Sequence, residues 1–196
     1  LFISFLPYIL STIFVLTSLC LGALCSCHTV PDCFAGKSIQ LGWLAISWDW
    51  HNENKRTPGV MCHPSDGEAW KHFDRTYPDF ASEPRNIRLG LCADGFTPYS
   101  VSAAPYSCWP VFLTPYNLPP EMCMTSPYIF LNCVIPGPRN PKVLIDVYIQ
   151  PLIDELKQLW CEGVVTYDIS TKSNFNMRAS LMWTINDFLA YEMLSG

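Results

Sequence analysis

Two aspartates that follow apolar runs are the residues of this sequence best suited to chemistry. Asp94 directly follows the run IRLGLCA (87–93), and Asp187 follows the run FNMRASLMWTI (175–185) and Asn186. Two ionised carboxylates brought together repel each other, and a divalent cation relieves that repulsion. Two Mg²⁺ ions about 4 Å apart can activate a water or a 3′-hydroxyl in phosphoryl transfer. The pair therefore suggests a metal site for phosphoryl transfer, and turn formation or helix capping is the alternative role.

The elements that would bring these acids together are predicted from residue 86 onward in the order strand, strand, strand, helix, strand. The predicted strands are 87–93, 108–115, 128–135 and 175–185, and the predicted helix is 142–162, where apolar residues recur every three or four positions. Pro110 favours an edge position for the second strand, and Pro151 is expected to kink or split the helix.

Three hairpin strands followed by a helix that returns the chain parallel to the first strand form a mixed α/β layout. In such a layout the last strand commonly lies beside the first. Asp94 and Asp187 would then lie side by side at one edge of the sheet.

Residues 43–85 are rich in aromatic and charged residues and show little periodicity. One short helix is expected at 65–74, because Ser65 or Asp66 can cap its first amides. His63 is expected to be a hydrogen-bonded structural residue. The aromatic residues of the chain are expected to fill the core rather than stack on bases.

Charge is unevenly distributed along the chain. The formal net charge is −5, whereas a self-sufficient nucleic-acid binder is usually basic, so a grip on DNA phosphates would lie mostly elsewhere. No charged side chain precedes Asp32, and residues 1–25 are almost wholly apolar. About 20 such residues suffice to span a bilayer as a helix. Residues 1–31 are therefore a membrane anchor, an export signal or sequence foreign to the rest of the chain.

Four segments carry a resemblance to a known family. They are HPSDGEAWKHFDRTYPDFASEPRNIRLGLCADGFTPYS (63–100), SCWPVFLTPYNLPPEMCM (107–124), IPGPRNPKVLIDVYIQPLIDELKQLWCEGVVTYD (135–168) and RASLMWTINDFLAYEMLSG (178–196). Together they closely resemble the transposases of plant CACTA-type (En/Spm-like) DNA transposons, in order and without large gaps.

The resemblance implies a DDE/D transposase with an RNase H-like catalytic core. Its first acidic residue falls on Asp94 and its second on Asp187, whereas the third, a Glu, would follow the last residue, Gly196. It also implies Mg²⁺ or Mn²⁺ held by these acids, transposon ends and target DNA as partners, and a nuclear location. Family members cut DNA at transposon ends and join a 3′-hydroxyl to target DNA.

The sequence departs from the family pattern at several positions. Leu189 replaces a Pro, Glu192 replaces a Gly, and Cys62 stands where a basic residue is common. Residues 1–42 match nothing in the family, and both ends of the chain look cut. These features suggest a decayed copy with an apolar segment (1–31), an irregular pre-core segment (43–85) and an incomplete RNase H-like core (86–196).

A small single-pass membrane-anchored binding protein is the alternative. Residues 1–25 would be its span, and the rest would be a binding module. Carbonate extraction of membranes separates the two interpretations, because a spanning segment stays in the pellet.

We expect the 196-residue chain to be inactive by itself, because two carboxylates without the third do not fix two metal ions. The measurement is a nicking and strand-transfer assay on transposon-end DNA with Mn²⁺. Robust activity of the purified chain would refute this expectation.

Overall fold

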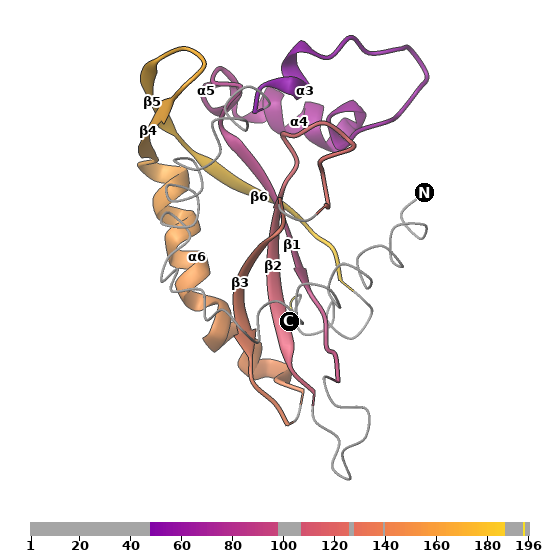
Figure 1. Ribbon diagram of the computed structural model, residues 1–196, viewed down its shortest axis with the longest axis vertical. Helices are drawn as coiled ribbons and strands as arrows, with labels where there is room; N and C mark the ends of the chain where they lie inside the picture. The colour runs from indigo at the N-terminus through magenta and orange to yellow at the C-terminus, as the bar shows by residue number, and fades with distance from the viewer. Residues whose placement is uncertain (1–47, 98–106, 126–127, 139, 187–193, 195–196) are drawn as a thin grey trace.

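The computed structural model describes residues 48–97, 107–125, 128–138, 140–186 and 194. These residues form one four-stranded sheet, a two-stranded hairpin, a long helix beside the larger sheet and short helices at one end of it (Figure 1). The elements, in chain order, are α3 (Trp50–Glu53), η2 (Pro64–Asp66), α4 (Glu68–Thr76), α5 (Pro78–Ala81), β1 (Ile87–Ala93), β2 (Trp109–Pro115), β3 (Phe130–Ile135), η3 (Lys142–Leu144), α6 (Ile145–Cys161), β4 (Val164–Asp168), β5 (Ser173–Met177) and β6 (Ala179–Thr184).

The order of strands in the main sheet is β3-β2-β1-β6. β1 pairs with β2 and β2 with β3 in antiparallel fashion, whereas β6 returns parallel to β1. The predicted mixed α/β layout, with the last strand beside the first, is therefore confirmed. β1 has the predicted bounds, and β2 and β3 each begin later than predicted.

The main core lies between the sheet and α6. Alternate residues of β1, from Ile87 to Ala93, point to this side, as period-two alternation requires. They pack against the buried face of α6, which consists of Ile145, Ile149, Leu152, Leu156 and Leu159. The apolar stripe that predicted the helix is thus the surface that holds it on the sheet.

Both expectations based on proline are wrong in part. β2 is an inner strand, not an edge strand. Pro110 is accommodated because the β1–β2 ladder extends only to the pair of Ala93 with Val111, so Pro110 needs no ladder bond to β1. α6 runs through Pro151 without splitting. Pro151 lies on the exposed side of the helix. The buried residues on either side of it, Ile149 and Leu152, keep both halves of α6 packed on the sheet.

The predicted strand 175–185 is two strands of two different sheets. β5 pairs with β4 in a hairpin, and β6 joins β1, with Arg178 between them. The backbone N–H of Arg178 donates to the side-chain oxygen of Asn86 (2.7 Å), and its carbonyl accepts from Ile87 (2.8 Å). These bonds fix the point where the chain leaves the hairpin and enters the main sheet.

The pre-core segment is less irregular than predicted. Instead of one helix at 65–74, the structure has η2, α4 and α5, which lie together at one end of the sheet (Figure 1). Asp66 accepts backbone N–H groups of Cys62 and His63 at 3.0 Å each, which completes the cap of η2. Pro78 begins α5, consistent with the preference of proline for the first turn of a helix.

No helix within the described part of the chain is long and apolar enough to cross a membrane. The apolar segment 1–31, with its expected helix and the alternative membrane span 1–25, lies outside the described residues. Asp187, Leu189 and Glu192 also lie outside them.

An ion pair joins the hairpin to the pre-core segment. Arg85 donates to Asp168 at the end of β4 (2.6 Å) and to Glu83 (2.6 Å), and it stacks on the Phe175 ring. Asp168 is buried, which by itself raises the pKa of its carboxyl. Hydrogen bonds from Ser170, Arg85 and Thr171 outweigh that effect and lower the pKa to about 2.

We expect Asp168→Asn to destabilise the protein by about 2 kcal/mol or more, because it removes the charge that Arg85 and the turn amides bind. Asp154→Asn, at an exposed position of α6, is the matched control and should change the free energy of unfolding by less than about 0.5 kcal/mol. Urea unfolding at pH 7 measures both. Equal stability of the two variants would contradict the role of this ion pair.

Candidate metal centre at the carboxyl ends of β1 and β6

Asp94 directly follows the last residue of β1 and is half-buried. The chain there is held close to β2. A Cβ added to Gly95 would lie 2.6 Å from ring atoms of Trp109, so only glycine lets the backbone rest on the indole. Phe96 and Cys108 then form an antiparallel bridge, with reciprocal backbone hydrogen bonds of 3.0 Å. The backbone that carries Asp94 is therefore fixed on both sides of the residue.

β1 and β6 stay joined beyond the last residue of β6. The backbone N–H of Ile185 donates to the carbonyl of Leu91 (2.7 Å). The backbone N–H of Ala93 then donates to the side-chain oxygen of Asn186 (2.9 Å). Asn186 thus replaces the backbone partner that a longer strand would have offered.

This second hydrogen bond joins the two residues that directly precede the predicted acids. Asp94 follows Ala93 in the chain, and Asp187 follows Asn186. The structure thus brings the residues before the two acids together, whereas Asp187 itself lies outside the described residues.

Two buried donors near this end of the sheet have no hydrogen-bond partner in the described structure. They are Nδ2 of Asn186 and Nε1 of Trp109. Buried polar groups are rarely left unpaired, and those that are often mark a place where a ligand or an ion-bound group completes the set. The sequence interpretation missed both residues. The position of Asn186 directly before Asp187 was the feature of the sequence that could have pointed to this residue.

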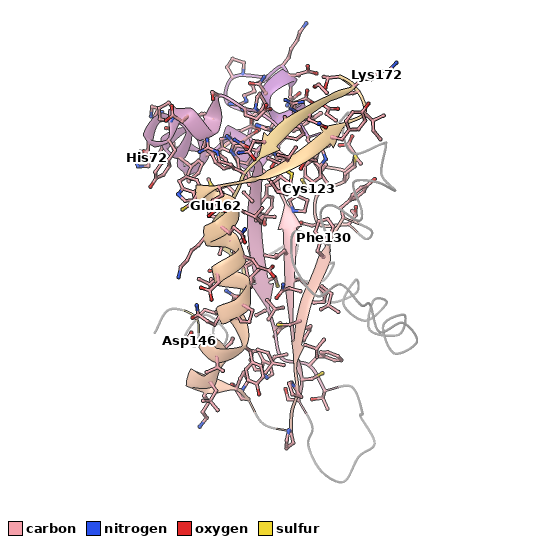
Figure 2. All side chains as sticks on the ribbon, turned by 90° about the vertical axis from the view of Figure 1, so that its left-hand side faces the viewer. His72, Cys123, Phe130, Asp146, Glu162 and Lys172 are labelled. Carbon is pink, nitrogen blue, oxygen red and sulfur yellow. The ribbon has the colours of Figure 1, made fainter. Side chains whose placement is uncertain are left out.

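The other acids in the described part of the chain do not form a competing centre. Asp146, at the lower end of α6 in Figure 2, and Asp154 are exposed, and so is Glu121. Asp168 is bound by Arg85 and by its own turn. The described residues contain no group of three or more His, Cys, Asp or Glu side chains that could hold a metal ion.

Two arginines at the amino end of β1, the end opposite to Asp94, are bound by acids of the same chain. Arg85 pairs with Glu83 and Asp168, and the exposed fraction of its side chain is 19%. Arg88 is almost completely buried: its guanidinium pairs with Asp74 (2.6 Å) and lies over the Trp70 ring. These guanidinium groups stabilise the fold, and they form no surface for DNA phosphates.

His63 is a structural residue, as predicted. Its Nδ1 accepts the backbone N–H of Ser65 (3.1 Å), and its Nε2 lies 3.1 Å from the carbonyl of Leu118. Since a carbonyl only accepts, Nε2 carries the proton and the ring is neutral. Burial lowers the pKa of His63, and the hydrogen bond to Leu118 opposes that effect.

His51 is buried against Arg88. Because arginine only donates, Nη1 of Arg88 donates to Nε2 of His51 (3.3 Å), and the imidazole is neutral. Burial lowers the pKa of His51 from its usual 6.5 to about 3, and the charges of Arg88 and Arg56 add to the effect. Asp74 is the acid that faces Arg88.

We therefore expect acid to destabilise the fold through His51. Because its folded pKa lies below the unfolded one, the unfolded chain binds more protons between about pH 6.5 and pH 3. The free energy of unfolding should fall as the pH falls through that window, and His51→Gln should make this dependence shallower. His72→Gln, at an exposed position of α4, is the control. Equal slopes for the two variants in urea unfolding at pH 7 and pH 5 would contradict the prediction.

Comparison with known proteins gives one match. The family model described as "Transposase family tnp2" matches residues 58–196, which include β1, β6 and both predicted acids. Neither the curated proteins nor the solved structures contain a match to the chain.

Proposed function

Because the chain belongs to the transposase family tnp2, we propose that it carries two metal ligands of a transposase that cuts and joins DNA. In this proposal Asp94 and Asp187 bind Mg²⁺ or Mn²⁺. The main sheet with α6 is then the part of an RNase H-like core that holds them. The CACTA-type (En/Spm-like) subgroup, transposon-end and target DNA as partners, and a nuclear location belong to the same proposal.

One observation carries the proposal. The backbone hydrogen bond from Ala93 to the Asn186 side chain joins the residues next to the two acids. It lies at the carboxyl ends of two parallel neighbouring strands, a common place for the ligands of α/β sheets. Two acids that were only turn formers would need no such proximity.

The strand order also supports an RNase H-like core. The order β3-β2-β1-β6, with three antiparallel strands and one parallel strand after a helix, is the layout that the resemblance implies. α6 covers one face, and β6 returns parallel beside β1 (Figure 1).

The chemistry of the donors fits the metal. Carboxylate oxygens are hard ligands that suit Mg²⁺ and Mn²⁺. When bound, the cation supplies charge stabilisation and an activated oxygen nucleophile for phosphoryl transfer.

The chain's own residues hold the first ligand in place. The β1–β2 ladder fixes the backbone up to Ala93, which precedes Asp94. The close contact of Gly95 with Trp109 fixes the backbone after Asp94.

We expect the chain to bind Mn²⁺ through Asp94. Asp94→Asn should raise the dissociation constant at least tenfold, because the amide removes the anionic ligand. Asp187→Asn should have the same effect, and Asp154→Asn on α6 is the control. Electron paramagnetic resonance of free Mn²⁺ in titrations at pH 7.5 measures the binding. Equal affinity of wild type and Asp94→Asn would overturn the metal site.

A further inference from the structure

We infer that Asn186 is a positioning residue for the acid pair. Its Oδ1 fixes the separation of the two strand ends, and its Nδ2 donates to a carboxylate oxygen of the pair when the metal is bound. The inference rests on the proposed function, because it assigns Asn186 a role toward the metal ligands. It does not make Asn186 a ligand.

The acceptor side of the amide is already engaged in the structure. Oδ1 of Asn186 accepts the N–H of Ala93 at 2.9 Å, one step beyond the bond between Ile185 and Leu91. The ladder of β6 itself ends at Thr184. The side chain therefore extends the pairing of the two strands to the residues that adjoin the acids, where a backbone ladder alone would stop.

The donor side is engaged by nothing in the described structure. Nδ2 of Asn186 is buried and has no hydrogen-bond partner there. Leaving a buried amide donor unpaired is unfavourable. A carboxylate oxygen is the strongest acceptor that this part of the sequence offers, since Asp187 is the next residue and Asp94 follows Ala93. A metal-bound carboxylate keeps a lone pair for such a bond.

A β-bulge explains how the side chain comes to lie at this position. Leu89 pairs with Leu181 and Gly90 with Trp183, so Met182 is one extra residue in β6. An extra residue reverses which face the following side chains occupy, and bulges commonly re-aim side chains next to active sites. The bulge therefore determines on which face of the sheet the side chains after Met182 lie, up to the strand end with Asn186.

The test compares Asn186→Leu, which has a similar volume but neither acceptor nor donor, with wild type. Mn²⁺ affinity is measured by electron paramagnetic resonance at a temperature where circular dichroism shows both proteins folded. We expect the dissociation constant to rise about tenfold or more. Asn174→Leu, at an exposed position of β5, is the matched control and should bind Mn²⁺ as wild type does. A purely structural role would lower the melting temperature and leave the Mn²⁺ affinity of the folded protein unchanged.

A second measurement directly follows the hydrogen bond between the Ala93 amide and the Asn186 side chain. The Ala93 amide should exchange slowly with deuterium in wild type and in Asn186→Asp, which keeps the acceptor, and faster in Asn186→Leu. If Asn186→Leu does not fold, Asn186→Ser takes its place in both measurements, because its shorter side chain does not span the same distance. Equal protection of the Ala93 amide in all variants would contradict the role of Asn186 in joining the two strand ends.

The outcomes separate the two proposals. If Asp94→Asn weakens Mn²⁺ binding and Asn186→Leu does not, the positioning role of Asn186 is wrong and the metal site stands. If Asp94→Asn leaves Mn²⁺ binding unchanged, the metal site is wrong, and the role of Asn186 fails with it.

Discussion

The parallel pairing of β6 with β1 is the interaction on which the rest of the structure depends. It closes a loop of more than 80 residues of chain, from Ala93 to Ala179, and such closure costs conformational entropy that local contacts do not repay. The compensation comes from α6, whose buried leucine and isoleucine side chains pack on the face formed by β1 and its neighbours. Burial of that apolar surface holds β6 beside β1, and this pairing is what the proposed site requires.

Buried polar contacts then join the pre-core segment to the same strands. Asn117 accepts the N–H of Arg88 and donates to the carbonyls of Trp48, Pro84 and Asn86. Asn86 in turn binds Phe80 and Arg178. Because these amides are buried and paired, replacing either would leave several backbone groups unsatisfied. The segment before the sheet is therefore part of the structure that fixes where β1 and β6 begin.

The predictable part of the fold is the part set by hydrophobic pattern. The run 87–93 gave the bounds of β1, and the periodicity at 142–162 gave α6, because both elements bury a regular face against the core. The hairpin of β4 and β5 was missed because its strands are short and largely exposed, so no pattern marks them. The bulge at Met182 and the side-chain bond of Asn186 depend on register between distant strands, which no local pattern encodes. For the site, the sequence predicted correctly that the strands before Asp94 and Asp187 are neighbours, whereas the pairing of the two acids stays a prediction. The sequence did not point to Asn186, whose side chain joins the ends of these strands.

A neutral amide is the side chain best suited to join these strand ends if the acids lie beside it. Two carboxylates repel each other before a metal binds, and that repulsion would separate β1 from β6 just where the ladder stops at Thr184. An Asp at 186 would accept the Ala93 N–H equally well, but it would add a third negative charge. A Lys would neutralise the pair and compete with the metal. Asn supplies the acceptor without either charge, and in the proposed site its remaining donor would stabilise the anionic form that binds the cation.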